Sequence, residues 1–124
     1  MYYFQSRELT SELPHFFIVV NRDPIGEQLL LLTIVTSNVA DVRTRNHDRL
    51  HTVVEISPQK YNELTMLSAV DCNVELEKPL AELVGMVERQ EIRYHRDLPL
   101  KLFAKIKTAI LASRLVPDEL KELL

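Results

Sequence analysis

Short apolar runs separated by polar or turn-forming residues fill the first half of the chain. The runs are residues 2–4 (YYF), 16–20 (FFIVV), 28–36 (QLLLLTIVT) and 51–56 (HTVVEI). β-branched and aromatic residues favour strands, so each run predicts a short strand. Pro14 bounds the second run, and the turn-forming residues 21–26 follow it. The leucine-rich run is long and apolar enough to predict a strand covered on both faces.

A fifth strand is predicted by strict alternation in residues 68–76, SAVDCNVEL. A period of two sends successive side chains to opposite faces of a sheet. The predicted core set is Val70, Cys72, Val74 and Leu76, and the predicted water-facing set is Asp71, Asn73 and Glu75. Residues 38–50 are polar and charged with no period, so a long loop is expected there.

The second half of the chain has helical spacing. Residues 79–90 carry apolar side chains three and four apart, which predicts an amphipathic helix that Gly85 weakens. Asp97 is the expected N-cap of the next and strongest helix. Its apolar stripe is Leu102, Phe103, Ile106, Ala109, Ile110 and Ser113. A short last helix is expected over residues 117–123.

The order of these elements predicts the fold class. Five short strands, within about 2–76, are followed by helices, within about 79–124, and the two types do not alternate. This order favours an α+β, mainly β domain, an antiparallel sheet or small barrel with C-terminal helices packed at one end. A chain of 124 residues is expected to form a single domain.

Composition and charge limit the class of protein and the compartment in which it is expected. The chain is 46% hydrophobic and 27% charged, and its net charge is −3, which excludes a general nucleic-acid coat protein. It has no apolar stretch of about 18 residues and no recognisable leader, so a cytoplasmic protein without membrane contact is expected. The single cysteine, Cys72, suits a reducing compartment and is predicted as a small core residue.

Basic residues gather in two segments, 43–51 and 89–107. The first holds three arginines and two histidines against one acid. Such clusters are typical of a solvated surface or of a phosphate-binding surface, and the sequence leaves both interpretations open.

Several kinds of site are excluded by what the chain lacks. Only two glycines are present, so there is no glycine-rich phosphate loop and no dinucleotide fingerprint. His47 and His51 are four residues apart but do not lie on a predicted helix, so no zinc site is expected. There is also no Gly-x-Ser-x-Gly elbow. We therefore expect neither a metal nor a cofactor.

The succession of these segments resembles the MazF/PemK toxin family, whose barrel is shared with the gyrase toxin CcdB. The resemblance rests on a Pro-His step before FFIVV, an Asn-Arg-Asp-Pro turn, a strand ending in Val-Thr-Ser, the alternating strand SAVDCNVEL and a terminal helix. It covers roughly residues 13–115. It implies a small SH3-like β-barrel, a homodimer and a sequence-selective endoribonuclease held inactive by a cognate antitoxin.

Residue by residue, the resemblance implies a catalytic hydroxyl at Thr36, with Ser37 beside it. Such toxins usually carry an arginine immediately before the first long strand, whereas this chain has Pro14 and His15 there. The usual Gly-Asp opening strand is replaced by residues 1–4.

The chemistry of RNA cleavage assigns roles to these residues. A base must take the proton of the ribose 2′-hydroxyl, and donors must stabilise the charge that develops on the phosphate. The predicted catalytic residues are His15, as base or acid, and Thr36 and Ser37, as donors. The predicted RNA-binding residues are Arg43, Arg45, His47 and Arg49. No metal is required.

Each of these residues also has a structural interpretation. His15 fits a satisfied structural histidine, Thr36 and Ser37 fit a strand-ending turn, and the arginines fit a solvated loop. The predicted function is thus a toxin that cleaves single-stranded RNA. The alternative is a non-catalytic binding or regulatory member of the same barrel family that binds a protein partner.

Overall fold

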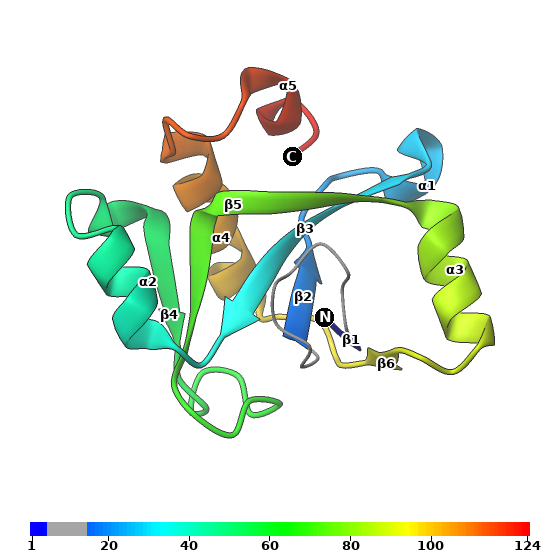
Figure 1. Cartoon of the computed structure of the whole chain (residues 1–124), viewed down its shortest axis with the longest axis horizontal. Helices are drawn as coiled ribbons and strands as arrows, with labels where there is room; N and C mark the ends of the chain where they lie inside the picture. Colours follow the sequence, from blue (N-terminus) through cyan, green and yellow to red (C-terminus); the bar gives the residue numbers. More distant parts are fainter. Residues whose placement is uncertain (5–14) are drawn as a thin grey trace.

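The computed structural model describes residues 1–4 and 15–124, and within them it is an α+β fold dominated by one antiparallel sheet (Figure 1). Its strands are β1 (Tyr2–Phe4), β2 (His15–Val19), β3 (Leu29–Thr36), β4 (Val53–Ile56), β5 (Ser68–Pro79) and β6 (Arg93–Tyr94). Its helices are α1 (Pro24–Glu27), α2 (Val39–Arg45), η1 (Leu50–Thr52), α3 (Leu80–Glu88), α4 (Leu100–Ala112) and α5 (Asp118–Lys121). All five predicted strands are present. Pro14, the expected boundary of the second, lies outside the described residues.

The strands hydrogen-bond in the order β4-β5-β3-β2-β1-β6. The sheet is open, with β4 and β6 at its edges, so the predicted closed barrel is not confirmed. The described residues contain six strands rather than about five. The expected division into a strand half and a helix half is also wrong, since α1 and α2 lie between strands and β6 follows α3.

The leucine run of β3 is buried on both faces of the sheet, as its sequence predicts. Leu30 and Leu32 pack in one apolar cluster with Leu83 of α3, whereas Leu31 packs in a second cluster with Ile106 of α4. Burying a leucine fully stabilises a fold by about 1.5–3 kcal/mol. The two helices therefore cover opposite faces of the central strand.

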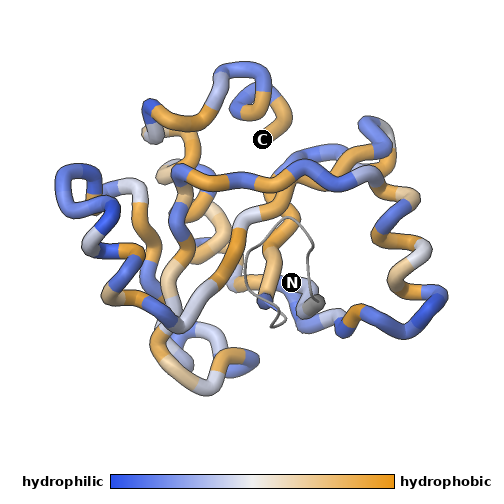
Figure 2. The backbone as a smooth tube through the Cα atoms, viewed as in Figure 1, coloured by the Kyte–Doolittle hydropathy of each residue, from blue (hydrophilic) through white to orange (hydrophobic). Residues whose placement is uncertain are grey.

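The helices behave largely as their apolar spacing predicts. The stripe of α4 is buried at Leu102, Ile106, Ala109, Ile110 and Ser113, and α3 continues through Gly85 without a break. Figure 2 shows hydrophobic and hydrophilic segments alternating along α3. The N-cap of α4 is Pro99 rather than Asp97. Asp97 instead accepts a hydrogen bond from the Tyr94 hydroxyl, 2.9 Å away. No helix in the described part of the chain is both long and apolar enough to span a bilayer.

The expected loop over residues 38–50 is wrong, because α2 forms within it. The helix buries one apolar side chain, Val42, so its sequence has no visible helical period. Polar contacts hold its ends instead. The Asn38 side chain donates to Asp41, 2.7 Å away, and the Thr44 hydroxyl donates to the Ala40 carbonyl, 2.9 Å away.

The alternation predicted for β5 is broken by a bulge. Thr33 pairs with Glu75 and Val35 pairs with Val70, so the single residue between Thr33 and Val35 lies opposite residues 71–74. Extra residues in one strand shift which side chains face the core. Asp71 and Asn73 are consequently buried, and Val74 is exposed, against the prediction. Cys72 is buried in the core, as predicted.

Glu75, at the end of this bulge, occupies a hollow that Pro117 and Leu120 also line. Its side chain is half-buried, and its Oε1 has no hydrogen-bond partner in the described part of the chain. Burial, with a smaller contribution from the charge of Asp71, raises the pKa of Glu75 to about 8. The folded protein therefore favours the neutral carboxyl.

We expect Glu75→Gln to stabilise the protein at pH 9 by about 1 kcal/mol, less than the full pKa change implies because the carboxyl keeps contact with water. Between the ordinary pKa of 4.5 and about 8, the folded state binds more protons than the unfolded state. Stability of the native protein thus falls as pH rises through this window. Urea unfolding at pH 4 and pH 9 measures the effect, which should vanish at pH 4. Glu77→Gln, at an exposed position of the same strand, is the control; an equal gain there would contradict the prediction.

Candidate functional site

The predicted catalytic residues His15 and Thr36 stand at the adjoining ends of β2 and β3. The antiparallel register pairs Phe16 with Val35, so His15 and Thr36 are the next residues outward on neighbouring strands. Neighbouring strands lie about 4.8 Å apart, which brings the two side chains within reach of one group. The chain thereby juxtaposes two residues that are 21 positions apart in sequence.

The same row continues across the sheet. Thr36 pairs with Ala69 of β5, and Ala69 pairs with Glu55 of β4. We call His15, Thr36, Ala69 and Glu55 the His15–Glu55 row. Glu55 was not among the predicted site residues, and its only sequence signal is its place in the strand HTVVEI.

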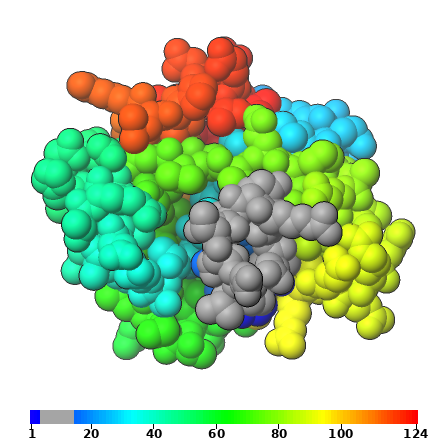
Figure 3. Space-filling model, viewed as in Figure 1, coloured from blue at the N-terminus to red at the C-terminus, as the bar shows by residue number. Residues whose placement is uncertain are grey.

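The row lies on the sheet face opposite α4. Phe16, Val35 and Val54, which neighbour the row along their strands, all pack in the cluster that includes α4. Because side chains alternate between faces, the row points to the other side. Figure 3 shows this side, with α2 and α3 at opposite flanks and β5 running between them.

The side chain of His15 is suited to proton transfer. It is half-buried, and its Nε2 atom has no hydrogen-bond partner among residues 1–4 and 15–124. A buried polar atom that lacks a partner costs free energy, so it is well placed to bind a polar ligand group. Imidazole is also the side chain that most readily exchanges a proton near neutral pH.

Thr36 and Ser37 supply hydroxyls where β3 ends. Thr36 Oγ1 accepts a hydrogen bond from the Asn38 backbone, 3.1 Å away, which is the turn contact expected of a strand-ending threonine. This contact uses an oxygen lone pair, so the hydroxyl proton stays available to an acceptor. Ser37 is exposed.

Arg43 connects α2 to the row. It lies in the last turn of α2, and its guanidinium forms an ion pair with Glu55 Oε1. The side chain of Arg43 is 55% exposed, and that of Glu55 is 35% exposed. The guanidinium thus lies beside the row, with N–H donors exposed to solvent. A phosphate oxygen could accept from these donors in place of the Glu55 carboxylate or together with it.

The other three predicted RNA-binding residues do not join the row. Arg45 Nε donates to Asp71 Oδ2 at 2.9 Å, and Arg49 Nε donates to Asn46 Oδ1 at 2.7 Å. His47 is exposed, with Nδ1 3.3 Å from the Thr44 carbonyl oxygen. Arg45 and Arg49 therefore serve the folded structure through contacts with side chains that the sequence did not single out.

These contacts belong to a buried polar network at the β5 bulge. We define it by Asp71, Asn73, Asn46, Thr52 and Ser113, all of which are buried. Asn73 Nδ2 donates to Thr52 Oγ1 at 2.8 Å and to Asp71 Oδ1 at 2.9 Å, and Ser113 Oγ donates to Asn73 Oδ1 at 2.5 Å. A connected network of this kind fixes one geometry, here that of α2, η1 and the end of α4.

Hydrogen bonds of this network stabilise the ionised form of Asp71. Burial by itself would raise the pKa of Asp71, but hydrogen bonds from Asn46, Arg45 and Asn73 outweigh it and keep the pKa below its ordinary value. Asp71 is therefore ionised at neutral pH. In the sequence, the only indication of this network is two polar residues, Asp71 and Asn73, within a predicted strand.

Two comparisons with known proteins gave no match. The chain matches no protein-family model and no curated protein. In the part of the chain that the structure describes, no group of three or more His, Cys, Asp or Glu side chains could hold a metal ion.

Proposed function

We propose that this protein is the toxin of a toxin–antitoxin system and cleaves single-stranded RNA without a metal. The observation that carries the proposal is the register of β2 and β3, which brings His15 beside Thr36. Arg43 adds a cation to the same face of the sheet. A base, a hydroxyl donor and a cation are the groups that phosphodiester cleavage by the neighbouring 2′-hydroxyl requires.

In the proposed reaction, the ribose 2′-oxygen loses its proton and forms a bond to the adjacent phosphorus. The bond from phosphorus to the 5′-oxygen breaks, and that oxygen takes a proton. His15 serves at one of these proton transfers and solvent at the other. Thr36 and Ser37 donate hydrogen bonds to the phosphate oxygens, and Arg43 offsets their charge. The products carry a 2′,3′-cyclic phosphate and a 5′-hydroxyl.

The resemblance to MazF/PemK toxins extends the proposal to partners and setting. We propose a cytoplasmic homodimer that a cognate antitoxin inhibits, with each subunit a small SH3-like barrel of that family. An edge strand that lacks a neighbour is a ready site for association, and β6 is the edge of the described sheet that we propose for the homodimer contact.

We expect Thr36→Ala to lower the rate of RNA cleavage about 10²–10³-fold, because one donor to the developing charge is lost. The assay incubates pure protein with single-stranded RNA and identifies the termini of the fragments. Thr65→Ala, at an exposed position that is not part of the row, is the matched control and should cleave normally. RNA that stays intact at high protein concentration would exclude the proposed activity.

A non-catalytic module that binds a protein partner is the second candidate. One observation favours it: Arg43, Arg45 and Arg49 all contact acceptors of their own chain, which reduces the positive charge offered to RNA. Such a module would leave RNA intact and would keep its partner in a Thr36→Ala variant.

A further inference from the structure

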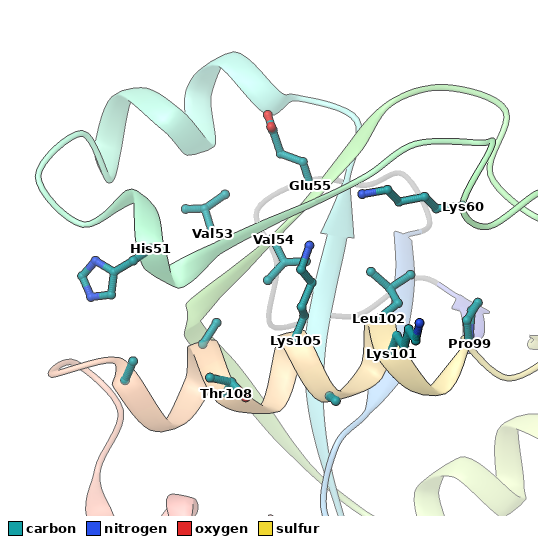
Figure 4. Close-up of a pocket in the computed structure, with 13 residues that line it drawn as sticks. His51, Val53, Val54, Glu55, Lys60, Pro99, Lys101, Leu102, Lys105 and Thr108 are labelled. Atoms are coloured by element: carbon teal, nitrogen blue, oxygen red, sulfur yellow. The ribbon is translucent and has the colours of Figure 1, made fainter.

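A groove of about 1210 Å³ separates β4 from α4 (Figure 4). Val53, Val54 and Glu55 line it from the strand, and Leu102, Lys105 and Ala109 are among the residues that line it from the helix. We call it the β4–α4 groove. It borders the His15–Glu55 row only at Glu55.

The groove follows an unpaired edge of the sheet. Val53, Val54 and Glu55 are consecutive residues of β4 and all line the groove, so the groove runs along this strand. In the described part of the chain, β4 pairs with β5 and with no other strand. The Val53 N–H already donates to the Leu50 carbonyl of η1, so another strand would pair with the backbone groups that follow Val53 in β4.

The floor and the rim of the groove differ in polarity. Val54, Leu102 and Ala109 on the floor are all buried by 90% or more and are apolar. The exposed basic residues of the rim are His51, Lys60, Lys101 and Lys105. The one acid in the lining, Glu55, is already ion-paired with Arg43.

We propose that this groove binds an extended segment of a partner protein in which acidic and apolar residues alternate. The segment adds to the sheet as a strand beside β4, so its backbone supplies the missing hydrogen bonds. Its apolar side chains cover Val54 and Leu102, and its carboxylates pair with the lysines of the rim. Charge complementarity selects the acidic partner.

The same charges disfavour two other occupants. A second copy that docks β4 against β4 about a two-fold axis would place the lysines of one rim against those of the other. Single-stranded nucleic acid would meet an apolar floor, and none of the lining residues is Phe, Tyr or Trp, so its bases would find only the imidazole of His51 to stack on. This inference does not rest on the proposed RNA cleavage.

The test measures binding of a fluorescein-labelled peptide of alternating glutamate and valine by fluorescence anisotropy. Reversing two rim charges, in the double variant Lys101→Glu and Lys105→Glu, should weaken binding at least ~10-fold. Lys107→Glu is the control on the same helix, because Lys107 lies over the Phe103 ring and does not line the groove. It should bind as the native protein does.

A second probe needs no change in the protein. The same peptide with N-methylated amides on alternate residues keeps its charge but loses the donors of a strand, so the native protein should bind it far more weakly. Equal binding of the two peptides, or equal loss in the Lys107→Glu control, would overturn the proposal. So would displacement of the peptide by a single-stranded RNA of equal charge, or by self-association of the protein through β4.

Discussion

Replacing His15 with alanine is expected to reduce RNA cleavage about 10²–10⁴-fold, the range typical for loss of a general acid or base. His15 is the titratable side chain that the β-sheet register places beside Thr36, and its Nε2 atom has no partner in the described residues. The fold should persist, since the side chain is half-buried and lies at the end of β2. Cleavage rates on single-stranded RNA, with circular dichroism as the check on folding, measure the effect.

A second substitution of His15 separates a chemical role from a structural one. His15→Gln keeps a side chain that forms hydrogen bonds but cannot transfer a proton, so it should lose cleavage as His15→Ala does. The control is His51→Ala, which changes an exposed histidine of η1 and should leave the cleavage rate unchanged. A His15→Ala variant that cleaves at the native rate would remove His15 from the mechanism.

Replacing Asp71 with asparagine is expected to lower the free energy of unfolding by about 3 kcal/mol at pH 7. Asp71 Oδ2 accepts from Arg45 Nε at 2.9 Å and from Asn46 Nδ2 at 3.0 Å. An amide in this place either turns its own N–H groups toward these donors or offers them a weaker acceptor. The buried network then keeps a donor without a partner, and urea unfolding should register the loss.

At acidic pH, the native protein and the Asp71→Asn variant should differ less in their free energy of unfolding. Hydrogen bonds hold the pKa of Asp71 below its ordinary value of 3.8, so the stability that its charge contributes is present above that pH. It is lost as pH falls through the lowered pKa of the folded state. Asp118→Asn, at an exposed position, is the control and should change stability little. A cost for Asp71→Asn as small as that of the control would contradict the structural role of the network.

The sequence predicts the strands and helices whose apolar pattern is set by local burial. The leucine run of β3 and the stripe of α4 are examples, since each buried position follows the period of its own element. The sequence does not predict the bulge in β5 or the helix α2. The bulge depends on how β5 pairs with β3. Helix α2 depends on Val42 and on polar contacts to other elements, which carry no period.

The candidate site also contains some residues that the sequence predicts and others that it does not. His15 and Thr36 end adjoining antiparallel strands, so the turn-forming residues predicted between these two strands were enough to bring them together. Glu55 joined the row only through the pairing of β4 with β5. Arg45 and Arg49 looked like free cations because their acceptors, Asp71 and Asn46, are distant or ordinary in sequence.

The length of β5 has a consequence for how the protein opens. This 12-residue strand pairs with β3 on one side and, near its start, with β4 on the other. The α2–β4 region therefore cannot separate from the rest of the sheet unless β5 loses one of its two neighbours. Local unfolding should begin instead at β6 and at α5, which do not pair with β5. The rest of the described structure should unfold as one cooperative unit.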